Sequence, residues 1–444
     1  MKYSYLSIIL AGAIFASCKP TIEAPVPDKG NADFTTYVAV GNSLTAGYAD
    51  GSLYRSGQEN SYPAMLAAQF KMVGGGDFKQ PLLPGEAGWP GLRRVLGYSK
   101  GCDGVTGLGP ILYNAQIDTA GSIINIASQG PFNNVGVPGI RCIDYTTAGY
   151  AYGALVLGGV GYAYRFYPSP LTDRPIDVAT KLNPTFFSMW LGSNDVLGYA
   201  TNGGEGNGAG GTLPTDISPL SAFQSVYQSV VGAMVSKGAK GVLINIPDVT
   251  AIPFFTTVPA KGLALTSDAQ VAALNTAYAP LGINFTLGAN YFIIQDAAAP
   301  GGLRQIKSGE YILLTIPQDS IKCKGWGSSK PIPRKYVLDA TEVANVQTAT
   351  AAFNAVIKTA ADANGLAYVD ANTYLRTLQT GIKYNGVTYS PTFVSGGAFS
   401  LDGVHLTPRG YALIANQIIS AINSKYAARI SSVDVNKYDG VLFP

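Results

Sequence analysis

Short apolar segments alternate with amphipathic helical segments along most of this 444-residue chain. Five of the apolar segments have the length and composition of buried strands, at residues 37–40, 123–127, 185–191, 242–246 and 366–369. Three further stretches place apolar residues at helical spacing, at 223–234, at 342–364 and in a last helix that we expect to begin with Thr407 as N-cap and Pro408 in its first turn. Strands that alternate with helices in this way predict an α/β fold with a mainly parallel sheet.

Two long stretches interrupt the alternation, at about 51–120 and 251–338. The first is rich in Gly and Pro and contains one helical pattern at 63–71, and the second contains a helical pattern near 267–278 and one or two strands. Segments of this length with little regular structure are usually functional or mobile. We therefore expect both to be insertions that cover or border the functional site of one domain. That domain is expected to span residues 33–430, with a C-terminal tail at 431–444.

The composition argues against several classes of protein. Hydrophobic residues make up 47% of the chain and charged residues 13%, which is enough apolar surface for a large core. The net charge of +3 and the lack of a Lys/Arg block argue against a nucleic-acid partner. A G-x-G-x-x-G pattern at 206–211 neither follows a strand nor opens a helix, and a single histidine argues against a metal site. We therefore expect no cofactor and no metal.

The N-terminus has the pattern of an export signal. Lys2 precedes an apolar run at 5–16 that is too short to span a bilayer, and small residues stand directly before Cys18. This arrangement resembles a bacterial lipobox, which implies a signal peptide at 1–17 and, at 18–32, a lipidated Cys18 with a Pro-rich tether. We expect a membrane-anchored lipoprotein, periplasmic or on the cell surface, with the outer membrane favoured. The alternative is an ordinary secretory signal in which the cysteine is incidental.

An exported protein can form disulfides, and three cysteines remain besides Cys18. They are Cys102, Cys142 and Cys323. A bond between Cys102 and Cys142 is the favoured pairing, and it would leave Cys323 free. The sequence alone leaves the pairing open.

The chain contains one histidine, His405. A hydrolase that uses an imidazole base must therefore use this residue. Asp402 lies three residues earlier, so its carboxylate can accept a hydrogen bond from one ring nitrogen and leave the other free as a base. The alternative is a surface loop in which Asp402 only forms a turn. Asp370, which follows another predicted strand, is a second candidate for the acid, but its spacing to His405 gives no local geometry.

Ser43 closely follows the first predicted strand. In a parallel sheet this position is the carboxyl edge, where α/β proteins bind ligands. A helix beginning there would direct N–H donors at an oxyanion formed on the serine. The alternative is a serine that only caps the helix. Ser99 stands in a G-x-S-x-G pattern at 97–101, but its neighbours predict a loop instead of the strand, turn and helix that this motif needs.

Four short motifs contain these residues and several others of the same chemistry. They are Gly41-Asn42-Ser43-Leu44, Asn134-Val135-Gly136-Val137-Pro138-Gly139, Gly192-Ser193-Asn194-Asp195 and Asp402-Gly403-Val404-His405. Together they resemble the four blocks of SGNH/GDSL hydrolases, in the order of that family, with Asn42 where the family usually has Asp. The resemblance covers about residues 36–424 apart from the two insertions. It implies a flavodoxin-like, three-layer α/β/α hydrolase fold.

The resemblance also implies a role for each residue. Ser43 would attack the acyl carbonyl, His405 would act as its base, and Asp402 would orient the imidazole. The N–H groups of Ser43 and Gly139 and the side-chain amide of Asn194 would bind the oxyanion. The implied activity is hydrolysis of carboxylic esters through an acyl-serine at the cell envelope, on an acyl lipid or an acetylated glycan.

Two other functions are compatible with the same motifs. An inactive envelope lipoprotein could keep the hydrolase fold as a binding or scaffold module, with the insertions as a partner surface. An acyltransferase that moves acyl groups between glycans could use the same serine and histidine. Labelling of Ser43 by a serine-directed probe would exclude the first of these.

Overall fold

Four parallel strands form the centre of the fold. They are β1 (Tyr37–Gly41), β4 (Phe186–Trp190), β5 (Lys240–Ile244) and β12 (Ala367–Val369), in the order β1-β4-β5-β12. The structure is a computed structural model that describes residues 26–114 and 121–443, so the predicted signal peptide at 1–17 and Cys18 lie outside the described residues. Four of the five predicted strands and their parallel direction are confirmed.

The strand predicted at 123–127 is wrong, because residues 121–126 have no regular structure. Residues 133–137 run parallel to β1 instead, with the N–H of Ala39 donating to the carbonyl of Asn133 at 2.8 Å. With this segment in the outer position, the sheet has the flavodoxin-like order 2-1-3-4-5.

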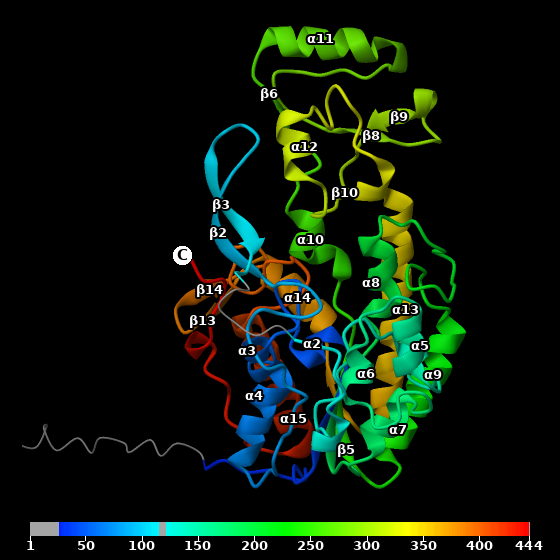
Figure 1. Ribbon diagram of the computed structural model, residues 1–444, viewed down its shortest axis with the longest axis vertical. Helices are drawn as coiled ribbons and strands as arrows, with labels where there is room; N and C mark the ends of the chain where they lie inside the picture. Colours follow the sequence, from blue (N-terminus) through cyan, green and yellow to red (C-terminus); the bar gives the residue numbers. More distant parts are fainter. Residues whose placement is uncertain (1–25, 115–120, 444) are drawn as a thin grey trace, which may run out of the picture.

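Helices cover both faces of the sheet (Figure 1). One face carries α4 (Tyr62–Lys71) and α15 (Pro408–Tyr426). The other face carries α7 (Pro175–Thr180), α9 (Leu220–Val235) and α13 (Ala340–Ala363). The three-layer α/β/α architecture is therefore as predicted, and it leaves the two ends of the strands free for a site.

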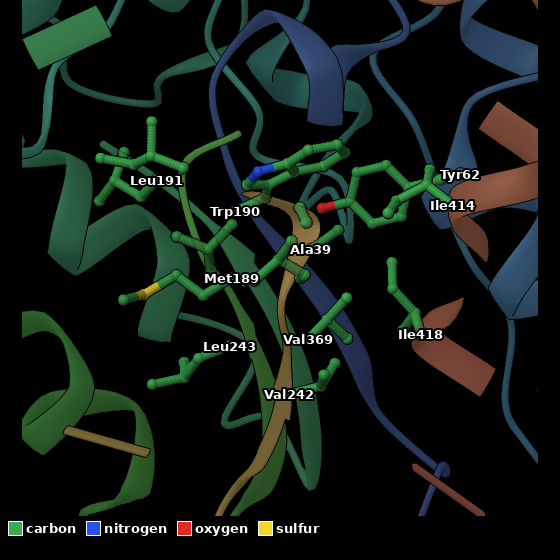
Figure 2. Close-up of a cluster of buried hydrophobic side chains, with 14 of the residues drawn as sticks. Ala39, Tyr62, Met189, Trp190, Leu191, Val242, Leu243, Val369, Ile414 and Ile418 are labelled. Atoms are coloured by element: carbon green, nitrogen blue, oxygen red, sulfur yellow. The ribbon is translucent and has the colours of Figure 1, made fainter. Parts of the chain in front are cut away.

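The core lies between these layers. Figure 2 shows Ile414 and Ile418 of α15 with Tyr62 of α4 on one side of the strands, and Met189 and Leu243 pointing to the other side. All five side chains are buried. Ile414 and Ile418 are four residues apart, so they lie on one face of the helix and meet the sheet together.

The helix beginnings follow from capping side chains. The Thr407 hydroxyl accepts from the N–H of Gly410 at 3.1 Å, and Pro408 occupies the first turn of α15, as predicted. At α13, Asp339 and Glu342 form a reciprocal capping box, so this helix begins slightly before the predicted residue 342.

The second insertion, residues 251–338, forms an arm that projects from the α/β body at the top of Figure 1. Its elements are α10 (Pro253–Thr256), β6 (Leu263–Leu265), α11 (Asp268–Tyr278), β7 (Gly288–Asn290), β8 (Ile293–Gln295), β9 (Leu303–Gln305), β10 (Tyr311–Ile312), α12 (Gln318–Cys323) and β11 (Val337–Leu338). The strands pair antiparallel as β6-β7, β8-β9 and β10-β11. Two apolar clusters of its own stabilise the arm.

The first insertion contains an antiparallel hairpin of β2 (Arg94–Lys100) and β3 (Thr106–Leu112). Ser99 and its G-x-S-x-G pattern therefore lie mainly in a hairpin strand, and the predicted loop is wrong. Neither a strand of the parallel sheet nor a helix flanks this serine, so it does not have the setting of a nucleophile elbow.

The disulfide joins Cys102, beside the turn of this hairpin, to Cys323 in α12, with the Cα atoms 6.3 Å apart. The predicted bond between Cys102 and Cys142 is wrong. Cys142 is buried in the body, where its Sγ donates to the carbonyl of Phe223 at 3.7 Å. The hairpin and the arm extend from the body side by side, which brings together two cysteines that are 221 residues apart in sequence.

Both ends of the described chain pack against the body. The backbone of Asp28 pairs with that of Arg429 through hydrogen bonds of 3.2 and 2.8 Å, and Val433 and Val435 are buried. Some residues of the expected tether and tail are thus ordered against the domain. Within the part of the chain that the structure describes, no helix has the length and apolar character to cross a membrane.

The remaining regular elements are short. They are α2 (Ser43–Ala46), α3 (Arg55–Glu59), α5 (Tyr150–Val156), α6 (Tyr162–Phe166), α8 (Asn194–Thr201), α14 (Ala371–Gln379), β13 (Ile382–Tyr384) and β14 (Val387–Tyr389), with 3-10 turns η3 (Ala127–Gln129), η4 (Cys142–Asp144), η5 (Val249–Ala251), η6 (Ala279–Leu281), η7 (Pro300–Gly302), η8 (Arg334–Tyr336) and η9 (Val435–Lys437).

Candidate active site

The register of the sheet brings two of the predicted site residues to one edge. Gly41, the last residue of β1, pairs with Trp190, the last residue of β4. Ser43 follows β1 by two residues, and Asn194 follows β4 and begins α8. Because the strands are parallel, both side chains lie at the carboxyl edge of the sheet.

A tight turn holds Ser43 at the end of β1. A Cβ atom on Gly41 would lie 2.1 Å from Thr45 Oγ1 and 2.5 Å from the carbonyl of Trp190, so only glycine fits there. Asn42 caps α2, since its side-chain oxygen accepts from the N–H of Leu44 at 3.1 Å. The side chain at position 42 therefore holds the turn, a task that the usual Asp of the motif can also perform.

The structure places Ser43, His405 and Asp402 in one chain of hydrogen bonds. His405 Nε2 lies 2.8 Å from Ser43 Oγ, and His405 Nδ1 lies 2.8 Å from Asp402 Oδ2. Asp402 Oδ1 also accepts from the backbone N–H groups of Val404 and His405, both at 2.8 Å. The spacing of three residues thus places the carboxylate and the imidazole in one turn.

The environment of Asp402 keeps its carboxyl group ionised. Burial by itself would raise the pKa of Asp402, but the charge and ring N–H of His405 and the backbone donors lower that pKa well below its ordinary value of 3.8. An ionised carboxylate at Nδ1 fixes the ring orientation and leaves Nε2 facing Ser43 as an acceptor.

Both insertions contact the loop that carries Asp402. The N–H of Gly51 donates to Asp402 Oδ2 at 2.9 Å, and the N–H of Phe254 donates to the carbonyl of Gly403 at 2.9 Å. Asp50 adds a hydrogen bond from its N–H to Ser400 Oγ at 2.9 Å. The sequence carries no local signal for these contacts, because the partners are more than 100 residues apart.

Tyr48 packs against the imidazole, with ring centroids 4.6 Å apart and the rings tilted by 49°. Its hydroxyl donates to the carbonyl of Gly51 at 2.6 Å, and burial raises the pKa of Tyr48 to about 12. The ring is thus a fixed, neutral wall beside His405. No sequence motif marks Tyr48 as a site residue, although it stands only five positions after Ser43.

The predicted oxyanion donors lie close to Ser43, and a hydrogen bond connects the loops that carry Gly139 and Asn194. Asn194 Nδ2 donates to the carbonyl of Ile140 at 2.9 Å, which leaves its second amide hydrogen for a ligand. Gly139 has φ of +84°, and a Cβ there would meet no atom within 4 Å, so its backbone borders open space. Ser43, Gly139, Asn194 and His405 all line the same cleft.

Asp195 anchors these two loops to each other. Its Oδ2 accepts from the N–H of Cys142 at 2.7 Å, one turn after Gly139. Burial raises the pKa of Asp195 to about 7, against the lowering effect of the Cys142 N–H. Asp195 is fully buried and does not line the cleft, so its position fits a structural role as the anchor between these loops.

The cleft has a volume of about 820 Å³ and a mainly apolar lining. One wall is formed by residues 147–163, which include α5 and part of α6. No described residue of 51–120 or 251–338 lines the cleft. The insertions thus contact the loop that carries Asp402 without lining the cleft, and the wall comes from residues 147–163, which no sequence motif marks.

The other candidates lie elsewhere. Asp370 caps α14 by accepting from the N–H of Thr373 at 3.0 Å, and it also accepts from Asn245 at 2.9 Å. Asp402 is therefore the carboxylate that faces His405. Among residues 26–114 and 121–443, no cluster of three or more His, Cys, Asp or Glu side chains has the arrangement to bind a metal ion.

A parallel α/β sheet with a Ser, His and Asp chain of hydrogen bonds at its carboxyl edge defines a serine hydrolase. Residues 37–418 match the family model described as GDSL-like lipase/acylhydrolase, and the chain belongs to that family. It is therefore a GDSL-type esterase or lipase, an enzyme that hydrolyses carboxylic esters.

Two solved structures resemble the chain over most of its length. The lipase/acylhydrolase from Enterococcus faecalis is 12% identical, with 89% of this chain and 98% of that chain covered and a TM-score of 0.34. The extracellular lipase from Streptomyces rimosus is 14% identical, with 88% and 98% covered and a TM-score of 0.33. No curated protein matches the chain.

Proposed function

We propose that this enzyme hydrolyses its ester through an acyl intermediate on Ser43. The observation that carries the proposal is the contact of 2.8 Å between Ser43 Oγ and His405 Nε2, with Asp402 held on the opposite ring nitrogen. In the first step, Oγ attacks the carbonyl carbon while Nε2 takes the hydroxyl proton. The imidazolium then gives this proton to the leaving alcohol as the C–O bond breaks.

Water completes the cycle by the same path. His405 removes a proton from a water molecule, which attacks the acyl-serine, and Ser43 Oγ leaves with the proton that the imidazolium returns. In both halves the carbonyl oxygen becomes an oxyanion. The N–H groups of Ser43 and Gly139 and the free amide hydrogen of Asn194 are its proposed donors, each of which typically contributes about 10²–10³ in kcat.

Replacement of the nucleophile tests this proposal. Ser43→Ala should lower turnover of p-nitrophenyl acetate by roughly 10⁴-fold or more. Ser99→Ala is the matched control, since Ser99 is exposed in the β2 strand. A fluorophosphonate probe should label the unmodified enzyme and the Ser99 variant but not the Ser43 variant. Activity retained without Ser43 would exclude the acyl-serine mechanism, and an unlabelled protein without activity would indicate a scaffold.

We further propose that the enzyme works at the cell envelope, attached through Cys18. The support is the sequence of residues 1–18 and the Pro-rich stretch that follows. Radiolabelled palmitate should enter the unmodified protein and not a Cys18→Ser variant. Equal labelling of both would rule out this anchor. Substrates at such a location include acyl lipids and acetylated glycans.

A further inference from the structure

The wall of the cleft belongs to a stretch of chain almost without charge. Residues 145–172 contain one ionisable side chain of the Asp, Glu, Lys, Arg and His set, Arg165. Arg165 is buried and donates to the carbonyls of Pro81 and Leu82, both at 2.8 Å. The guanidinium is therefore bound by backbone carbonyls inside the protein, and this stretch presents no charged side chain to solvent.

The same region exposes large apolar side chains. These are Leu157 at 88%, Ile124 at 70%, Leu171 at 67%, Val156 at 60% and Tyr152 at 44% exposure, and we call these five residues the apolar rim. Tyr152, Val156 and Leu157 belong to α5 or its end. The N–H of Tyr152 donates to the carbonyl of Pro170 at 3.2 Å, which places Leu171 beside α5.

Ile124 joins the rim from a separate stretch of chain. The side chain of Asn125 donates to the carbonyls of Tyr164 and Tyr167, at 2.6 and 3.0 Å. The N–H of Ile126 donates to the carbonyl of Arg165 at 2.7 Å. The segment that carries Ile124 is thus fastened along α6, which in turn contacts α5. In Figure 1, α5 and α6 lie next to each other, below α8.

The rim is continuous with the site of reaction. Leu157 is both the most exposed member of the rim and one of the residues that line the cleft with Ser43 and His405. Tyr150, Gly153 and Ala154 of α5 line the cleft as well. One short helix therefore presents apolar side chains to the cleft and to solvent at its mouth.

The free-energy cost of exposing the apolar rim to water indicates that the rim binds a partner. Exposed apolar surface costs roughly 25 cal/mol per Å² relative to burial, and contiguous apolar patches on soluble proteins usually mark binding surfaces. A glycan would need hydrogen-bonding partners, and the rim offers only the Tyr152 hydroxyl. A lipid surface can be bound through apolar side chains alone, and its acyl chains are the part that the mainly apolar cleft accommodates.

We propose that the apolar rim seats this enzyme on the surface of a lipid aggregate, and that its substrates are acyl lipids drawn from that surface into the cleft. This inference rests on the proposed function, since it names the substrate class of the Ser43 site. The rim makes the attachment by apolar burial, so zwitterionic lipid suffices and salt has little effect.

Vesicle binding tests the surface without relying on catalysis. The full chain with Cys18→Ser and Ser43→Ala, which has neither an anchor thiol nor turnover, should co-sediment with phosphatidylcholine vesicles equally in 0.1 and about 0.5 M NaCl. Adding Ile124→Asp and Val156→Asp, both outside the cleft, should weaken binding by about tenfold or more. The matched control adds Met72→Asp and Leu287→Asp, at the end of α4 and on the arm, where side-chain exposure is 53% and 54%. This control should bind normally.

Activity on two substrates completes the test. With Ser43 restored, the Ile124 and Val156 double variant should hydrolyse a long-chain ester embedded in vesicles about tenfold more slowly, and soluble p-nitrophenyl acetate at an unchanged rate. No binding to phosphatidylcholine, binding only to anionic vesicles that salt abolishes, or equal loss in the control variant would overturn the inference. A dimer that the rim variant disrupts, without vesicle binding, would show that the rim serves self-association instead. Failure of the unmodified site on the soluble ester would overturn the proposed function alone.

Discussion

The backbone N–H of Gly51 donates to Asp402 Oδ2, the same carboxylate oxygen that lies 2.8 Å from the ring of His405. The two residues are 351 positions apart, and their contact measures 2.9 Å. The start of the first insertion thus supplies a donor to the acid at the far end of the chain. Burial alone would favour protonation of this carboxylate, but the charge and ring of His405 and the backbone donors of His405 and Val404 lower its pKa and keep it ionised.

Asp402→Asn should lower kcat/KM by about 10⁴-fold, because an amide at this position favours the wrong tautomer of His405. Asp370→Asn is the matched control, since Asp370 caps α14 and an asparagine caps equally well. Its kcat/KM should stay within about twofold on the same soluble ester. Comparable losses in the two variants would contradict the assignment of Asp402 as the partner of His405.

Asn194→Ala should reduce kcat by about 10²–10³-fold and leave KM nearly unchanged, because an oxyanion donor acts in the transition state and not on the bound ester. The side chain also donates to Ile140, so thermal unfolding should be measured alongside. Asn202→Ala, at the other end of the same helix, is the control and should retain full kcat. A rise in KM with unchanged kcat would show that Asn194 binds the substrate instead.

Asp195→Asn should stabilise the protein more at pH 8 than at pH 5. Burial raises the pKa of Asp195 from 3.8 to about 7. The folded protein therefore retains a proton that the unfolded chain loses at lower pH. The resulting stabilisation is complete below about pH 4 and disappears as the pH rises through 7. Asparagine keeps the acceptor for Cys142 without the charge.

The measurement for this variant is the unfolding temperature of both proteins at several pH values between 5 and 8. The difference between the Asp195 variant and the unmodified protein should grow with pH in favour of the variant. Asp402 has the opposite shift, so its own contribution is present above about pH 4 and falls only in stronger acid. A difference that stays constant across this range would contradict a protonated Asp195 in the folded state.

The double variant Cys102→Ser/Cys323→Ser should lose roughly 2–4 kcal/mol of stability, because the bond no longer restricts the unfolded chain. Neither cysteine lines the cleft, so turnover of a soluble ester should be unchanged at room temperature. Denaturant unfolding with and without reductant checks this. Reductant should lower the free energy of unfolding of the unmodified protein to that of the variant, and it should not change the variant. A loss of stability in the reduced variant would show that the reductant acts elsewhere than on this disulfide.

The sequence predicted those parts of the fold whose local pattern agrees with their final environment. The first, third and fourth predicted strands are mainly apolar runs, followed by Gly41, Gly192 and Pro247, and nearly all of their residues are buried in the sheet. Thr407 and Pro408 marked the last helix because capping is a local interaction. In contrast, residues 123–127 are mainly apolar but lie at the surface, whereas residues 133–137, which include two asparagines, join the sheet.

Contacts between distant parts of the chain could not be predicted from the sequence. Asn133 fits beside β1 because its amide donates to the carbonyl of Tyr37 at 2.9 Å, and no periodicity reveals this. The pairing of Cys102 depends on where a hairpin and an arm point in space. Ser43 and His405 could be predicted because each belongs to a short motif, one after a predicted strand and the other before a predicted helix. Tyr48 and the wall at 147–163 belong to no such motif, so the sequence did not predict their place at the site.

The bond between Cys102 and Cys323 gives the molecule a second covalent route between its two ends. Ser43 lies before the ring that this bond closes, and His405 lies after it, while Gly139 and Asn194 lie within the ring. A protease that cuts the backbone once, anywhere from 103 to 322, therefore cannot release the half with the hydroxyl from the half with the imidazole. The cut enzyme would migrate as one species until it is reduced.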